Sequence, residues 1–207
     1  MQGFFSLRRN AAALRALLQR MGPDARGVAA VEFAVIVPVM LTLYVGLVEV
    51  AQGVMVDRKV TQLNRSLADL ASQKKTISDA DMNNIFAAAQ TVMAPFTGVA
   101  PRMVINSVVI DSAGRARICW SDNRNASDLG KARGADVTLP DGLNTPNSSL
   151  IMARAQYRFM PMMGYVLTGE IMIDGGPIYM RPRIGSVGGN ANIEQVERSG
   201  KAMCPTF

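Results

Sequence analysis

Residues 28–48 read VAAVEFAVIVPVMLTLYVGLV and form the most apolar stretch of the chain, with Glu32 as its single charged residue. Because about 20 apolar residues in a helix cross the hydrocarbon core of a bilayer, this stretch predicts one transmembrane helix. A plain signal anchor and a very hydrophobic core helix are the alternatives, and the length and the arginine-rich flank disfavour the core helix. No A-x-A-like site follows Val48, so cleavage by a signal peptidase is not expected.

The residues before this stretch, 1–27, form a basic leader that contains five arginines and a single acid, Asp24. Since positively charged flanks stay on the cytoplasmic side, we expect a cytoplasmic leader, a span at 28–48 and everything from about residue 50 onward on the other side. Much of the net charge of +6 therefore lies in the leader. A nucleic-acid partner is not expected, because the charge does not form a folded basic face with interleaved aromatic residues.

Glu32 is unusual at its position. A carboxylate in the first turns of a membrane helix costs on the order of 3 kcal/mol unless it is paired or reaches the interface. The helix macrodipole compensates only slightly. The basic leader ends at Gly27, and Glu32 is the fifth residue after it. A carboxylate retained at such a cost is a candidate functional residue.

The joined pattern R-G-V-A-A-V-E-F-A, residues 26–34, resembles the start of type IV prepilins. More narrowly, it is similar to the TadE/TadG-like pseudopilins of the tight-adherence (Flp) pilus system. The similarity continues through further positions along the chain: Pro38, Gly46, Glu49, Tyr157, Pro161 and residues 179–183. The resemblance implies a pilin-like fold and a part in building an adhesion pilus.

The same resemblance implies roles for individual residues. A membrane-embedded prepilin peptidase would cut between Gly27 and Val28, where a glycine suits an extended chain in a protease groove. Glu32, followed by Phe33, would pair with the new α-amine of Val28 in its own chain or in the next subunit, and so set the register of stacked helices. The implied partners are the peptidase, other pilins or pseudopilins, and the bacterial inner membrane. The C-terminal part would lie in the periplasm or enter the pilus.

Pro38 lies inside the expected membrane helix and has no N–H to donate to the carbonyl of Ala34. We expect it to kink or loosen the helix. Two interpretations stay open: a break that is used when the helix leaves the membrane, and the ordinary tolerance of membrane helices for proline.

Beyond the span, the pattern predicts an α+β fold. Residues 49–73 continue as an amphipathic stalk, in which apolar residues recur at helical spacing: Val50, Val54, Val60, Leu63, Leu67 and Leu70. A capping cluster begins a second helix over 79–94. Within the expected domain, 74–207, five strands are predicted: 102–110 and 115–121 as a hairpin, 150–159, and 170–174 and 177–181 as a second hairpin around Gly175 and Gly176. An antiparallel sheet would pack on the C-terminal half of the long helix, as in pilins.

Strand 150–159 alternates clearly, because residues 151, 153, 155, 157 and 159 are apolar while Arg154, Gln156 and Arg158 are polar. The odd-numbered residues are expected to face the core. Residues 122–149 are polar and rich in Asn, Asp, Gly and Pro, which predicts a long loop. That loop could be an adhesive surface or an insertion without a role.

Both cysteines, Cys119 and Cys204, follow the span. The oxidising periplasm favours a disulfide between them, and two unpaired thiols are the alternative. A bridge would close a long loop, which by chain entropy stabilises on the order of 4 kcal/mol. It would also fix the glycine-rich tail to the sheet.

Composition excludes several kinds of chemistry. The chain has no histidine and only two cysteines, which removes Ser-His-Asp and Cys-His catalysis, His-ligated zinc, and Cys-only zinc or iron–sulfur sites. No residues form a convincing active site, and no cofactor or metal is predicted. We therefore expect a minor pilin or pseudopilin rather than an enzyme. The alternative is an unprocessed single-pass inner-membrane protein with a periplasmic binding or scaffold domain.

Overall fold

The computed structural model describes residues 27–161, 164, 167–189 and 192–204, so residues 1–26 of the leader lie outside it. The chain divides between Val48 and Glu49 into two compact units. We call residues 28–48 the span segment and the described residues from Glu49 onward the globular unit. One helix, α2 (Val28–Ser72), begins in the span segment and ends in the globular unit, close to the helix expected over 28–73.

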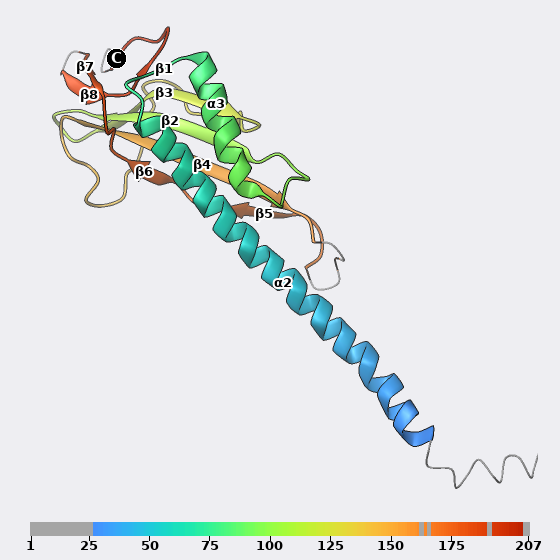
Figure 1. Cartoon of the computed structure of the whole chain (residues 1–207). Coiled ribbons are helices and arrows are strands. Elements are labelled where there is room, and N and C mark those ends of the chain that lie inside the picture. Colours follow the sequence, from blue (N-terminus) through green and yellow to red (C-terminus); the bar gives the residue numbers. More distant parts are fainter. Residues whose placement is uncertain (1–26, 162–163, 165–166, 190–191, 205–207) are drawn as a thin grey trace, which may run out of the picture. The chain divides into compact units, whose positions relative to one another are not determined.

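The globular unit packs its part of α2 against an antiparallel sheet, which confirms the α+β, pilin-like fold. Figure 1 shows α2 and α3 (Asp79–Gln90) covering the same face of that sheet. The face of α2 that packs inward carries five fully buried apolar residues at a spacing of three or four: Val56, Val60, Leu63, Leu67 and Ala71. This spacing places them on one helical stripe. Val50 and Val54, expected in the same pattern, are instead about half exposed.

The second helix begins with a capping box, in which the Ser78 hydroxyl accepts a hydrogen bond from the Asp81 N–H and the Asp81 carboxylate accepts one from the Ser78 N–H. The hydrogen bonds from the Ser78 side chain and backbone, helped by Lys74, lower the pKa of Asp81 to about 2. The helix continues as a 3-10 turn, η2 (Thr91–Met93), so the expected end near residue 94 is correct.

The central sheet has the order β3 (Ala116–Arg124), β2 (Arg102–Ile110), β4 (Ser148–Phe159), β5 (Ile171–Asp174), and β6 (Ile178–Met180) also pairs with β4. The β2–β3 hairpin is confirmed. The alternation of β4 is confirmed as well, because its residues at 151, 153, 155, 157 and 159 all join the buried cluster beneath α2. Short strands complete the unit: β1 (Thr76–Ile77) with β9 (Glu197–Arg198), and β7 (Ser186–Gly188) with β8 (Ile193–Gln195).

The second expected hairpin is wrong, because β5 and β6 pair with successive parts of β4 rather than with each other. Gly175 is needed for close packing instead of for a chain reversal. A Cβ at this position would lie 2.7 Å from Asn64 Nδ2 and 3.1 Å from Val60 Cγ1. The Asn64 amide also donates a 2.7 Å hydrogen bond to the Gly176 carbonyl. The chain is therefore held against α2 between two pieces of one edge strand.

The long loop is shorter than expected, because β3 continues to Arg124 and β4 begins at Ser148. Its apolar residues pack on the sheet face opposite α2: Ala135, Val137, Leu139 and Leu143. They cover a second buried cluster that includes Ile118, Leu150 and Met152. The loop thus closes the uncovered side of the sheet, which is a structural role that its polar composition did not indicate.

The edge strand β5 is held by an ion pair between Asp174 and Arg154. Burial alone would raise the pKa of Asp174, but hydrogen bonds from Arg154, Gln156 and the Gly176 N–H outweigh it and lower this pKa to about 2. A free aspartate has a pKa of about 3.9. The ionised Asp174 therefore stabilises the fold above about pH 4, and this contribution is lost as the pH falls toward about 2.

Asp174→Asn is therefore expected to reduce the loss of stability between about pH 4 and pH 2. Urea unfolding of the full chain in detergent, followed by the fluorescence of the single, buried Trp120, measures it. Asp141→Asn, which changes an exposed loop carboxylate, is the matched control. If the two variants had the same pH dependence as the unmodified chain, the ion pair would have no part in acid stability.

Candidate functional site: the start of helix α2

The residues that the sequence analysis assigned to processing lie at the first turn of α2. Gly27 directly precedes the helix and is exposed, and a Cβ at this position would meet nothing within 4 Å. Val28, the first helical residue, is 55% exposed. The peptide bond between them is thus uncovered by the part of the chain that the structure describes. Cleavage there remains a prediction.

Glu32 lies one helical turn after Val28 and is exposed. Residues four apart on a helix are neighbours, with Cβ atoms about 5–6 Å apart. A free α-amine at Val28 would therefore come within reach of the Glu32 carboxylate without any change in the helix. Phe33, the next residue, is 70% exposed. Within the part of the chain that the structure describes, both side chains are therefore exposed.

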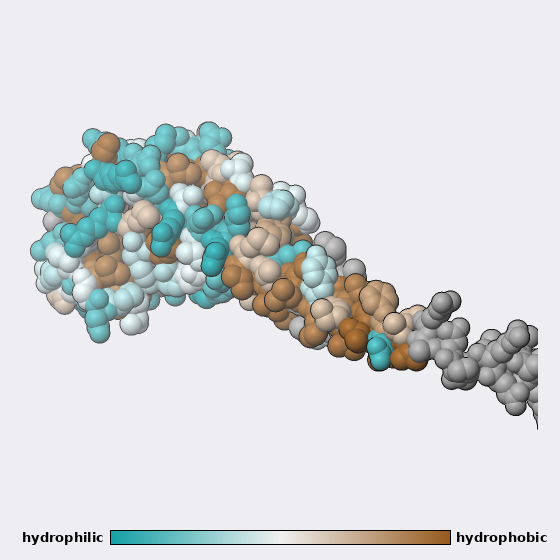
Figure 2. Space-filling model, turned by 60° about the horizontal axis from the view of Figure 1, so that its bottom comes forward, coloured by the Kyte–Doolittle hydropathy of each residue, from teal (hydrophilic) through white to brown (hydrophobic). Residues whose placement is uncertain are grey.

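The span segment exposes apolar side chains on all sides. Its residues with large exposed surfaces include Val31, Val35, Ile36, Val39, Met40, Leu41, Leu43, Tyr44 and Leu47. Figure 2 shows hydrophobic residues dominating the visible side of this part of the helix. Among the described residues, one helix is long enough and apolar enough to cross a membrane, and that helix is α2. A helix that is apolar all round and has no protein cover is typical of a membrane anchor.

Pro38 lies inside α2, and the helix continues through it. The Thr42 hydroxyl donates a 2.8 Å hydrogen bond back to the Pro38 carbonyl, one turn earlier in the helix. A kink at Pro38 stays a prediction.

Glu49 behaves differently from Glu32, although both are carboxylates in the apolar half of α2. Its side chain is 2% exposed, and its Oε2 accepts a 3.2 Å hydrogen bond from the Leu167 N–H. The two residues are 118 positions apart in the sequence. Only the fold brings this partner to the carboxylate, so the sequence analysis had no signal for it.

Cys119 and Cys204 form a disulfide with their Cα atoms 5.7 Å apart. Gln195 fixes the same tail from the side. Its amide donates a 2.6 Å hydrogen bond to the Cys204 carbonyl, and its carbonyl oxygen accepts a 3.0 Å hydrogen bond from the Cys204 N–H. Both cysteines are buried, and the Trp120 indole N–H next to them donates to the Val196 carbonyl. Cys204 is therefore anchored to β3 and β8.

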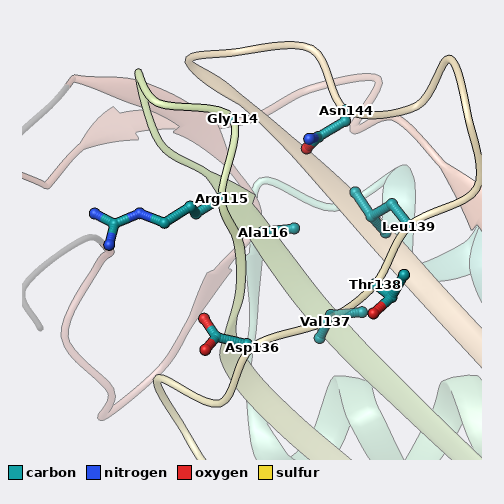
Figure 3. A pocket seen from close by; sticks show the side chains of 8 residues that line it. All are labelled: Gly114, Arg115, Ala116, Asp136, Val137, Thr138, Leu139 and Asn144. Carbon is teal, nitrogen blue, oxygen red and sulfur yellow. The ribbon is translucent and has the colours of Figure 1, made fainter.

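A surface pocket of about 410 Å³ lies between the β2–β3 turn and the loop that covers the second sheet face (Figure 3). Its charged residues, Arg115 and Asp136, are engaged in ion pairs with Asp111 and Arg117. Its remaining lining residues are Gly114, Ala116, Val137, Thr138, Leu139 and Asn144. Within the described ranges, no three Asp, Glu, His or Cys side chains are grouped as metal ligands.

A family model for TadE-like protein matches residues 27–68. Residues 27–68 are thus similar to the TadE-like family. The match covers Gly27, the span segment and most of the packed part of α2, and it confirms the resemblance that the sequence carries in this region. The matched family suggests a role in Tad pilus biogenesis. No curated protein and no solved structure matches the chain.

Replacing both cysteines by alanine is expected to lower the free energy of unfolding of the globular unit by about 4 kcal/mol, because the disulfide closes a loop with a sequence separation of 85. Urea unfolding of the full chain in detergent, with Trp120 as the reporter, measures this change. Treating the unmodified chain with a reductant in urea should produce the same midpoint as the double variant. An unchanged midpoint in both cases would mean that Gln195 and the surrounding core hold the tail without the bridge.

Proposed function

We propose that this chain is a minor pilin, or pseudopilin, that takes part in building a Flp/Tad adhesion pilus. The observation that carries the proposal is the combination at the start of α2: an exposed Gly27, an exposed carboxylate one turn into the helix, and a TadE-like match that includes both. The apolar, uncovered span segment supports a single-pass anchor in the bacterial inner membrane.

The proposed topology has the leader in the cytoplasm and the globular unit in the periplasm. The arginines of the leader support this orientation, because positively charged flanks stay in the cytoplasm. The disulfide between Cys119 and Cys204 supports it independently, since such bridges persist in the periplasm and are rare in the cytosol. Two features at opposite ends of the chain thus favour the same orientation.

Processing would proceed at the first turn of α2. A prepilin peptidase would hydrolyse the bond between Gly27 and Val28 and leave Val28 with a protonated α-amine. That amine would lie at the positive end of the helix, one turn before Glu32. In lipid, the carboxylate and the amine would each lack a counter-charge unless they paired, within one chain or between neighbouring subunits.

Pairing between subunits would set the axial register of neighbouring helices. Buried ion pairs contribute more to specificity of alignment than to stability, because their attraction is offset by the loss of hydration. The apolar surface around Glu32, including Val31, Phe33 and Ile36, would supply the contact area. Glu32 would therefore control assembly, while the fold of the globular unit would not depend on it.

Glu32→Leu is expected to insert into the membrane and fold normally but to abolish piliation. Glu32→Gln keeps the shape of the side chain and removes its charge, so it should fail in the same way. Val35→Leu, on the same exposed helical surface, is the matched control, and cells that carry it should form pili normally. Electron microscopy of surface pili and a surface-adhesion assay measure the outcome, with membrane level and disulfide formation as checks on folding.

Normal pili and normal adhesion in both Glu32 variants would contradict the assembly role. The alternative would then be an unprocessed membrane protein whose periplasmic unit binds or organises other components.

A further inference from the structure

We propose that the end of the globular unit at which β4 ends and β5 begins docks on the periplasmic lipid surface of the inner membrane. The docking surface consists of Val50, Val54 and Met55 on α2 together with Met160, Leu167 and Met172 from the β4–β5 end. The inference rests on the proposed function for the membrane anchor and adds a second, non-helical membrane contact to it.

Exposed charge resumes on α2 only well beyond the expected end of the span. After Glu32, the charged residues of the helix are Glu49 and then Asp57, Arg58 and Lys59. Glu49 is 2% exposed, so the outer surface of the helix carries no charge between Glu32 and Asp57. At 1.5 Å per residue this is about 37 Å of helix. The hydrocarbon core of a bilayer is about 30 Å thick, so the apolar surface is long enough to extend into the interface beyond it.

Exposed apolar side chains occupy the helix just after Glu49. Val50 is 46% exposed, Val54 is 49% exposed and Met55 is 48% exposed. In a water-soluble stalk, these positions would be polar, as Asp57 and Arg58 are one turn later. The apolar pattern here fits contact with lipid.

The β4–β5 end lies at the same level of the helix. The Leu167 N–H donates its hydrogen bond to Glu49, and a Cβ at Gly53 would lie 3.9 Å from both Leu167 Cδ1 and Phe159 Cε1. An apolar groove of about 340 Å³ runs between these elements, and Asp57 is the one charged residue among those that line it. The groove and the exposed face of α2 therefore form one continuous apolar surface.

The described apolar side chains at the β4–β5 end, which we call the tip, include two that are largely exposed. Met160 is 59% exposed and Met172 is 43% exposed. The sequence 159–169 contains no charged residue, and it is flanked by Arg158 and Glu170, whose side chains pair at 3.5 Å and are about half exposed. An apolar tip with a charged rim is typical of segments that enter the interface to a depth of about 5–10 Å.

The covalent connection argues for lipid as the occupant of this surface. The Leu167 N–H is hydrogen-bonded to Glu49, the residue that directly follows the span segment. Leu167 therefore lies within one helical turn of the residue at which the chain is expected to leave the bilayer. The burial of Glu49 is consistent with this contact, because protein shields its carboxylate at the level where the outer surface of the helix would meet lipid.

Depth-dependent quenching of a thiol-linked NBD fluorophore tests the proposal on the full chain. The native cysteines are joined in a disulfide, so an introduced cysteine is the reactive one. Three variants are labelled: Met160→Cys at the tip, Val35→Cys in the span segment, and Val187→Cys as the matched control. Val187 is 65% exposed and lies on β7, which pairs with β8. Strand β8 contacts the start of β4, whereas β5 pairs with the other end of β4, so Val187 lies away from the β4–β5 end. The chains are reconstituted in phosphatidylethanolamine–phosphatidylglycerol vesicles that contain doxyl-labelled acyl chains.

We expect quenching at residues 35 and 160 and none at residue 187, because a segment in the interface lies within reach of the labelled acyl chains. Quenching at 35 with none at 160 would overturn the docking while leaving the anchor intact. Absence of quenching at 35 would overturn the anchor and the docking with it. A blue-shifted, unquenched signal at 160 that grows with the protein-to-lipid ratio would assign the surface to a second copy of the chain, which also overturns the proposal.

Discussion

The stripe of α2 that runs from Val56 to Ala71 is the surface on which the globular unit is organised. Its apolar residues are completely buried, and they contact both the sheet and α3 in one cluster. The same helix is apolar on all sides in the span segment, where its side chains are exposed among the described residues. One continuous helix therefore carries two different patterns, and the change between them decides where the globular unit begins.

The two carboxylates in the apolar half of α2, Glu32 and Glu49, have different surroundings. Glu49 is covered by the globular unit and accepts a backbone N–H from Leu167. Glu32 is exposed, and the part of the chain that the structure describes provides no comparable cover for it. Because an unpaired carboxylate is costly in lipid, the difference favours a partner for Glu32 that comes from processing or from another subunit.

Local patterns were sufficient for most elements of the fold. Helical spacing located α2, the capping cluster at Ser78 located the start of α3, and alternation identified the buried face of β4. The disulfide followed from the expected compartment and was confirmed. The TadE-like motif was recognisable because it joins an arginine leader, Gly27 and Glu32 at fixed spacing.

The features that sequence reasoning missed depend on distant contacts. Gly175 and Gly176 suggested a hairpin, but the first glycine is there because Asn64 and Val60 approach it closely. The loop after β3 covers the second face of the sheet with four scattered apolar residues, which are too sparse to form a periodic pattern. Likewise, nothing near Glu49 in the sequence indicates that Leu167 is its partner.

The central claim is that α2 begins at a processed N-terminus, so the most direct measurement is the N-terminal residue and intact mass of the protein extracted from membranes. The comparison is made in cells with and without the prepilin peptidase. We expect a chain that starts at Val28 when the peptidase is present and at Met1 when it is absent. A chain that starts at Met1 in the presence of an active peptidase would contradict it.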